Sequence, residues 1–134
     1  VLDFWLLVAT FVSTLVFGIE YGILIGVGLS IVVLIFRTSR PYVVELGKVP
    51  DSDFYRNKAR FSEVIVDDIV LVFRFDAQLF YANANYFRDK LDELANQKGK
   101  KLELIVLDGE SINRVDSTGV EMLKDRIKFF RKKN

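Results

Sequence analysis

The sequence predicts a chain in two parts: an all-α transmembrane helical hairpin, followed by an α/β domain. Only Asp3 and Glu20 are charged among the first 36 residues, although 28% of the whole chain is Asp, Glu, Lys or Arg. The charged remainder alternates β-branched runs with segments of helical apolar periodicity, a pattern typical of α/β domains. A step in composition this steep indicates two environments, of which the first is lipid.

The hairpin rests on two uncharged runs, residues 4–17 and 21–36, which flank Gly18-Ile19-Glu20. Each run is shorter than the roughly 20 residues that span a bilayer, so we expect flanking residues to contribute. One continuous helix would place Glu20 at the bilayer centre, where a charge is costly, and we therefore predict helix–turn–helix. A signal peptide is disfavoured because no basic region precedes the first run. A buried soluble helix pair is disfavoured because neither run has a polar face.

Basic residues orient the hairpin. Arg37 and Arg40 follow the second run directly, which favours a cytoplasmic exit. A two-helix hairpin then returns the start of the chain to the same side. We expect residues 1–40 to form the transmembrane hairpin, in contact with membrane lipid, and residues 41–134 to form a cytoplasmic domain.

A stripe of small residues, Gly22, Gly26 and Ser30, recurs every four positions in the second run. On a helix these residues share one face and allow another helix to approach closely. We interpret the stripe as a packing surface for further transmembrane helices that the chain does not contain. The alternative is chance glycine in an apolar run.

The α/β domain begins after Pro41. We predict strands at residues 42–47, 63–67, 69–75, 79–82 and 102–107, with a polar loop at 50–60. Asn83 or Asn85 is expected to begin a helix that ends at Gly99. A second helix is expected from Val120 onward. The strand–helix–strand–helix order implies parallel pairing with a right-handed crossover.

The apolar faces of the two helices follow from residue spacing. Steps of three, four and three residues define one face in each helix: Ala84, Phe87, Leu91 and Leu94, then Val120, Leu123, Ile127 and Phe130. Basic residues from Lys98 to Lys101 flank the end of the first helix. We interpret them as helix C-terminal charges facing water, with contact to anionic lipid head groups as the alternative.

Composition excludes several kinds of chemistry. The chain has no Cys and no His, so disulfides, thiol nucleophiles, Ser-His catalysis and the commonest metal ligand are ruled out. A net charge of +1 gives no support for a nucleic-acid partner. Asp108 and Asp116 bracket one loop, but a Mg²⁺ site needs a further acid that is not clearly placed. We therefore expect a protein that is not an enzyme, with no catalytic residue, metal or cofactor.

The most informative segment is Asp116-Ser117-Thr118-Gly119, placed where a strand's carboxyl end meets a helix amino end. Thr118 and Glu121 have capping-box spacing, while Asp116 and Ser117 are the other candidate caps. A phosphate on Ser117 would meet free backbone N–H groups, but also the charge of Asp116. These residues are therefore either a phosphorylation or anion-contact site, or an ordinary cap and tight turn.

Four segments together resemble one known family: GIEYGILIGVGLS, RPYVVELGKVPDSDFYR, IVLVFRFDAQLFYANANYF and LIVLDGESINRVDSTGVEML. The chain resembles the carboxy-terminal part of the SulP family of anion permeases, in which the last two membrane helices lead into a cytoplasmic STAS domain. The resemblance implies a STAS-like mixed sheet with helices, incomplete at its C-terminus. It also marks Ser117 as the position that is phosphorylated in soluble relatives.

The resemblance implies part of a secondary active, sulfate-type anion transporter with a regulatory, dimerising STAS domain. The implied partners are a second copy, the missing transmembrane helices and an inorganic anion bound elsewhere in the full-length protein. The implied location is the plasma membrane or the bacterial inner membrane. The alternative is a signalling module, similar to anti-sigma-factor antagonists, switched by phosphorylation of Ser117.

Overall fold

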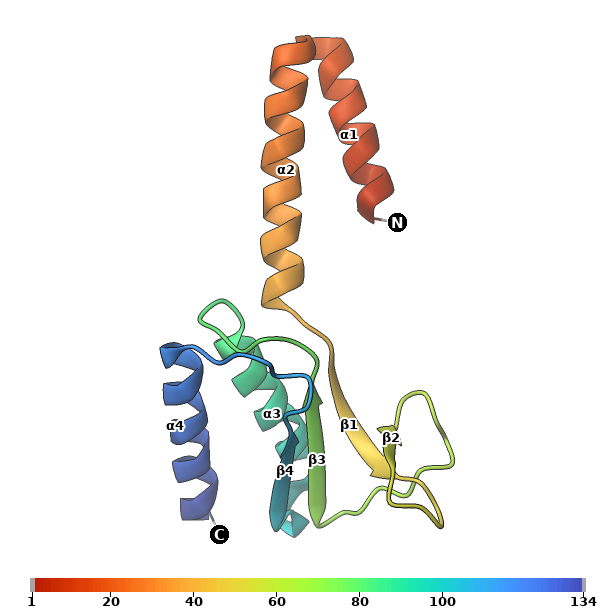
Figure 1. Cartoon of the computed structure of the whole chain (residues 1–134), viewed down its shortest axis with the longest axis vertical. Helices are drawn as coiled ribbons and strands as arrows, with labels where there is room; N and C mark the ends of the chain where they lie inside the picture. The colour runs from red at the N-terminus through yellow and green to blue at the C-terminus, as the bar shows by residue number, and fades with distance from the viewer. Residues whose placement is uncertain (1, 134) are drawn as a thin grey trace. The chain divides into compact units, whose positions relative to one another are not determined.

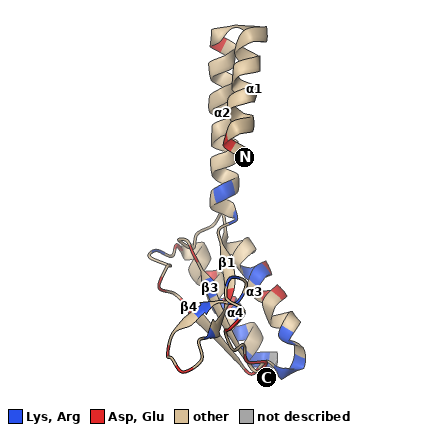
Figure 2. Ribbon diagram, turned by 90° about the vertical axis from the view of Figure 1, so that its right-hand side faces the viewer, with Lys and Arg blue, Asp and Glu red and all other residues tan. Residues whose placement is uncertain are grey.

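The computed structural model describes residues 2–133, and the chain divides into two compact units between Ser39 and Arg40 (Figure 1). The first unit consists of two helices, and the second combines a sheet with helices. Lys, Arg, Asp and Glu are concentrated in the second unit, as Figure 2 shows. The predicted α/β fold class with a preceding apolar helical pair is thus confirmed.

The first unit is a helical hairpin of α1 (Leu2–Phe17) and α2 (Ile19–Ser39). Gly18 separates them with a φ of 88°, a left-handed conformation that glycine adopts without steric cost. The predicted interruption before Glu20 is confirmed. An ion pair of 2.6 Å between Asp3 Oδ1 and Arg37 Nη2 joins the beginning of α1 to the last turns of α2.

The two helices approach closely where two residues of the predicted stripe lie. A Cβ atom on Gly22 would lie 2.8 Å from Thr14 Cα, and one on Gly26 would lie 2.8 Å from Thr10 Cγ2. Both threonine hydroxyls donate to carbonyls one turn earlier in α1, so the contact leaves neither polar group unsatisfied. These two glycines therefore pack against α1 of the same chain. Packing against helices outside the chain, including through Ser30, stays a prediction.

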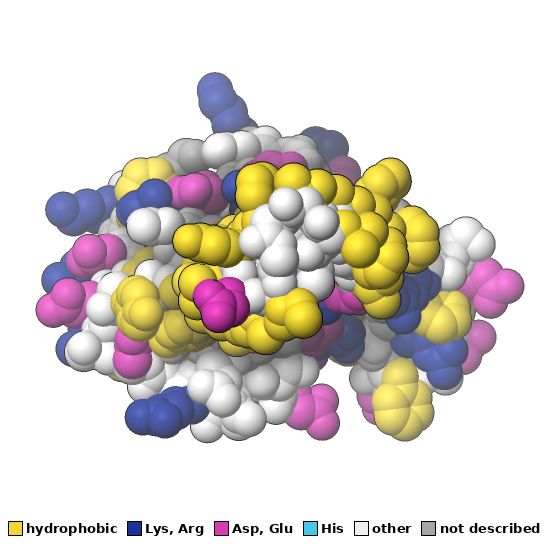
Figure 3. Space-filling model, turned by 90° about the horizontal axis from the view of Figure 1, so that it is seen from above, with side chains coloured by type: hydrophobic (Ala, Val, Ile, Leu, Met, Phe, Trp, Pro, Cys, Tyr) yellow, Lys and Arg dark blue, Asp and Glu magenta, His cyan; other side chains and the backbone are white. Residues whose placement is uncertain are grey.

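The outward faces of the hairpin are apolar. Among the described residues, α2 is the one helix long and apolar enough to cross a membrane, with a mean hydropathy of 2.4. Large side chains such as Trp5, Leu15 and Leu24 are 62–70% exposed. Figure 3 shows hydrophobic side chains gathered around the hairpin. An exposed apolar surface this continuous is unfavourable in water.

The second unit contains a four-stranded mixed sheet with the order β2-β1-β3-β4. Its strands are β1 (Val43–Lys48), β2 (Tyr55–Asn57), β3 (Val70–Phe75) and β4 (Leu104–Asp108). β1 pairs antiparallel with β2 and β3, whereas β3 and β4 are parallel. The parallel pair is connected by α3 (Ala84–Lys98) and the short 3₁₀ helix η1 (Gly99–Lys101), and α4 (Ser117–Lys133) follows β4.

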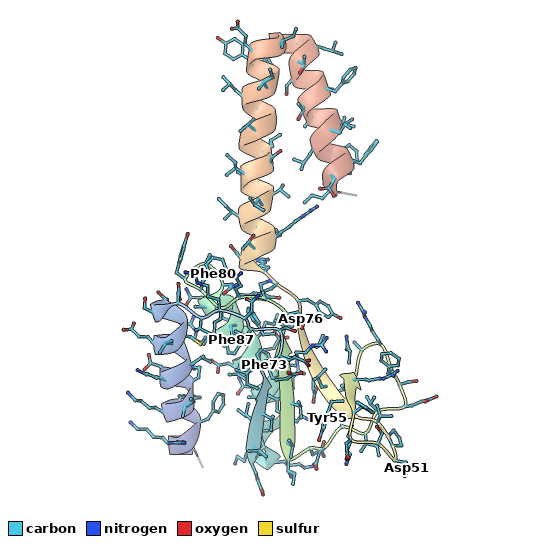
Figure 4. All side chains as sticks on the ribbon, viewed as in Figure 1. Asp51, Tyr55, Phe73, Asp76, Phe80 and Phe87 are labelled. Carbon is cyan, nitrogen blue, oxygen red and sulfur yellow. The ribbon has the colours of Figure 1, made fainter. Side chains whose placement is uncertain are left out.

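The core lies between β3 and α3. Leu71, Phe73 and Phe75 alternate along β3 and are fully buried. The Phe87 ring on α3 meets the rings of Phe73 and Phe75 edge to face, each at 5.0 Å between centroids (Figure 4). Leu91 and Ala95 continue the buried face of α3. The alternation of β3 and the periodicity of α3 thus bury the same cluster.

Two predicted strands and one predicted loop are wrong. Residues 63–67 contribute only an isolated bridge between Ile65 and Lys48, and residues 79–82 contribute only one between Leu79 and Val115. β2 lies inside the predicted 50–60 loop. Its backbone pairs with β1, but the side chains of Tyr55 and Arg56 are exposed, so no apolar alternation marks it.

Glu45 joins β1 to the end of α3. Its Oε1 lies 2.8 Å from Lys98 Nζ and its Oε2 lies 3.0 Å from Lys58 Nζ. The Glu45 and Lys98 side chains are only 9% and 8% exposed. Lys98 therefore does not face water, contrary to the interpretation of the Lys98–Lys101 segment. A buried carboxylate is tolerated here because two ammonium groups surround it.

We predict that Gly22→Leu separates α1 from α2, because the new side chain meets Thr14 where the helices are closest. The matched control is Gly28→Leu, since nothing lies within 4 Å of a Cβ at Gly28. Overpacking should cost about 1–3 kcal/mol of hairpin stability. SDS titration from a mild detergent, followed by the fluorescence of Trp5, measures the loss. Equal effects of the two substitutions would contradict the packing described.

We predict that the second unit loses stability as the pH falls below 4.5. Burial raises the pKa of Glu45, but the hydrogen-bonded Lys98 and Lys58 outweigh burial and hold the pKa below its ordinary 4.5. A carboxyl with a lowered pKa stabilises the fold above the unfolded pKa, and that contribution is lost as the pH falls through the folded pKa.

Urea titration in nonionic detergent, followed by circular dichroism, tests this. Glu45→Gln should lower the free energy of unfolding by about 3 kcal/mol at pH 7, because Lys98 then lacks its partner. The difference from the unsubstituted chain should shrink as the pH falls below 4.5 and Glu45 becomes protonated. Glu63→Gln, on an exposed loop, is the control and should change nothing at pH 7. A Glu45→Gln deficit that is independent of pH would contradict the pairing.

Candidate functional site

The Asp116–Gly119 turn lies beside the chain that leaves the carboxyl end of β3. Leu79, four residues after β3, bridges to Val115 in parallel, and its N–H donates to the Arg114 carbonyl over 2.9 Å. The Leu79 carbonyl in turn accepts a hydrogen bond of 3.1 Å from the Asp116 N–H. The turn is therefore fastened to the same edge of the sheet at which parallel strands end.

Asp116 caps α4, which decides among the three caps that the sequence leaves open. Its Oδ1 accepts a hydrogen bond of 2.8 Å from the Gly119 N–H, and its carbonyl accepts the first helical bond from Val120. Its Oδ2 accepts a hydrogen bond of 2.9 Å from the Tyr81 N–H. One carboxylate thus satisfies a free N–H group of the helix and a backbone group of the preceding segment.

Glycine is needed at position 119 because neighbouring atoms leave no room for a Cβ, and not because of its φ. It is buried, and a Cβ at this position would lie 2.9 Å from Val115 Cγ1 and 3.0 Å from the Leu79 carbonyl oxygen. Leu79 is itself fully buried, so the neighbouring chain cannot move outward without opening the core. Gly119 lets α4 begin directly against the segment that follows β3.

Ser117 and Thr118 are the exposed members of the turn. Ser117 is the first residue of α4, so its side chain is accessible at the positive end of the helix. Asp116, directly beside it, already occupies the Gly119 N–H that a phosphate would use. The geometry therefore accounts for the turn as a cap, and phosphorylation of Ser117 stays a prediction.

Asp108, the other acid at this edge of the sheet, bonds to the backbone of its own loop. Asp108 Oδ1 accepts from the Glu110 N–H at 3.1 Å. Within residues 2–133, the structure places no three His, Cys, Asp or Glu side chains where they could hold a metal ion together. Arg74 and Asp76 pair with each other, with 2.8 Å between Arg74 Nε and Asp76 Oδ1.

A family model described as the STAS domain matches residues 61–134, which form most of the second unit. The chain belongs to the STAS domain family. The matched residues include β3, α3, β4 and α4, and so contain both the core and the Asp116–Gly119 turn.

The STAS chain is also similar to sulfate transporters of Arabidopsis thaliana. It is 35% identical over 132 residues to the probable sulfate transporter 4.2, and 31% identical over 132 residues to the chloroplastic sulfate transporter 4.1. Both alignments cover 92% of this chain, and therefore include most of the apolar hairpin as well as the STAS portion. The chain spans about a fifth of the length of these relatives.

A solved structure of an anion transporter also matches the chain. The murine solute carrier 26 family member A9 anion transporter, in its inward-facing state, superposes with a TM-score of 0.83 at 27% identity. The match covers 98% of this chain and 21% of that chain. The resemblance to the anion permease family is thus confirmed, and these relatives favour it over the signalling alternative. Their names describe transporters rather than enzymes.

We predict that Asp116→Ala loosens the beginning of α4, whereas Ser117→Ala leaves it intact. Loss of the cap should cost about 1–2 kcal/mol, because the Gly119 and Tyr81 N–H groups both lose their acceptor. Hydrogen–deuterium exchange of the α4 peptides measures the change. Faster exchange in Ser117→Ala than in Asp116→Ala would contradict the capping geometry.

Proposed function

We propose that the chain is part of a secondary active transporter of inorganic anions of the sulfate type. In this proposal the hairpin belongs to the membrane scaffold, and the STAS portion is a cytoplasmic domain that regulates and dimerises. The observation that carries the proposal is that sulfate transporters match the hairpin and the STAS portion in one alignment.

The dimensions of the hairpin support insertion into a membrane. The 21 residues of α2, at about 1.5 Å each, extend roughly 30 Å, the thickness of the hydrocarbon layer. The 16 residues of α1 are shorter, and fit a tilted or partial crossing next to α2. Asp3 and Arg37 pair at the open end of the hairpin. Because Arg37 and Arg40 favour the cytoplasmic side, this end is the cytoplasmic one in the proposal.

The hairpin's polar groups support a scaffold role rather than anion binding. The hydroxyls of Thr10 and Thr14 are engaged with carbonyls of their own helix. Glu20 is a negative charge at the turn. The transported anion is therefore assigned to parts of the transporter outside these 134 residues.

Exposed apolar side chains support a partner for the STAS portion. Leu104 and Val106 on β4, and Val120, Ile127 and Phe129 on α4, are exposed although they are large and apolar. Such surfaces mark contacts with other protein. A second copy of the same transporter is the partner in this proposal.

A chimera tests the proposed function. We expect sulfate uptake when these 134 residues replace the matching segment of the Arabidopsis probable sulfate transporter 4.2, because both units then have their natural neighbours. Within the chimera, Gly22→Leu should reduce uptake strongly and Gly28→Leu should not. Uptake is measured with radioactive sulfate in a transport-deficient host.

Two results would contradict the proposal. One is a chimera that reaches the membrane in normal amounts but does not transport. The other is sulfate uptake into liposomes that contain only residues 1–134, because the anion pathway would then lie within the chain.

A further inference from the structure

A cavity of about 490 Å³ lies where α3 ends, and lysines make up most of its charged lining. The lysines come from distant parts of the sequence, since one follows β2 and the others lie at the end of α3 and in η1. The charged residues of this lysine pocket are Lys58, Lys98, Lys100, Lys101, Glu45 and Asp68. Four ammonium groups thus face two carboxylates.

The two buried charged side chains of the pocket, Glu45 and Lys98, already form an ion pair. Glu45 accepts a hydrogen bond from Lys58 and forms an ion pair with Lys98, which also donates to the Asp67 carbonyl. Because the Glu45 and Lys98 side chains are nearly inaccessible, this pair is a structural base of the pocket. Lys58 is different: its side chain is 53% exposed, so its ammonium group reaches solvent as well as Glu45.

The outer part of the pocket has an excess of positive charge. Lys100 forms no ion pair with a carboxylate among residues 2–133. Lys101 Nζ lies 3.0 Å from Asp68 Oδ2, and both side chains are about 70% exposed. An exposed pair of this kind is weak, so solvent ions compete with it readily.

Asp68 places a carboxylate among these ammonium groups, with its Oδ2 3.0 Å from Lys101 Nζ. The pKa of Asp68 is held below its ordinary 3.8 by the hydrogen-bonded Lys101, and Lys98 and Lys58 lower it further through their charge. A carboxylate carried on the exposed loop before β3 thus lies in the field of three ammonium groups. A free anion with more charge gains more from the same field.

We propose that the lysine pocket binds a doubly charged tetrahedral oxyanion of the sulfate or phosphate class. Lys58, Lys100 and Lys101 are the ligands, and the carboxylate of Asp68 is displaced when the anion binds. The site lies in the STAS portion and not in the hairpin, so it goes beyond the transport proposal and does not depend on it. Its exposure makes the binding weak and sensitive to salt.

An NMR titration of the whole chain in nonionic detergent tests the proposal. Lysine side-chain signals are followed while sodium sulfate or sodium phosphate replaces sodium chloride at constant ionic strength. We expect saturable shifts at Lys58, Lys100 and Lys101 with the divalent anions. Chloride alone should produce none.

Two substitutions at the pocket should act in opposite directions. Lys100→Gln removes a ligand without breaking an ion pair, and should weaken binding by up to about fivefold. Asp68→Asn removes the competing carboxylate, and should tighten binding by a similar factor. Lys124→Gln, on the exposed surface of α4, is the matched control and should change nothing.

The titration distinguishes specific binding of a divalent anion from a general effect of salt. Saturation by either anion supports the proposal and identifies which anion the pocket prefers. Shifts that do not saturate, or that chloride reproduces, would overturn it, as would weaker binding in Asp68→Asn. Failure of the sulfate-uptake chimera would leave this result untouched, because the titration involves no transport.

Discussion

The apolar outer surface of α1 and α2 must be covered, and in the function proposed above lipid and further transmembrane helices cover it. The two helices pack along only one face each, through Gly22 and Gly26, and leave side chains such as Trp5, Leu15 and Leu24 more than half exposed. In water this surface would drive aggregation, whereas in lipid it costs nothing and the packing of small residues alone decides how the helices pair. The concentration of charged residues in the second unit fits the same proposal.

In the STAS portion, one buried carbonyl organises the candidate site. The oxygen of Leu79 accepts from Asp116 and lies close to Gly119, so the beginning of α4 is fixed against the chain that leaves β3. Asp116 then holds Tyr81 as well as its own helix. Because Asp116 is hydrogen-bonded and Gly119 is buried, Ser117 and Thr118 are the exposed residues of the turn. Any regulatory contact at this edge must use them or the neighbouring exposed surface.

The sequence predicted what depends on periodicity and composition. Local patterns predict the interruption at Gly18, the apolar face of α3 and the end of α3 at Gly99. The short strand β2 does not, because backbone pairing alone defines it. The burial of Lys98 was missed for a similar reason: its partner Glu45 is more than fifty residues away, and nothing near Lys98 indicates it. A distant segment also holds the cap Asp116, since Tyr81 donates one of the two hydrogen bonds that its carboxylate accepts.

The fluorescence of Trp5 tests whether the hairpin lies in lipid. Trp5 is the single tryptophan of the chain. The chain is reconstituted into vesicles, and quenching by phospholipids with brominated acyl chains is compared with quenching by acrylamide in the water. A hairpin in lipid gives strong quenching by the brominated lipids and little by acrylamide. Full quenching by acrylamide, in a chain that also stays monomeric without detergent, would contradict it.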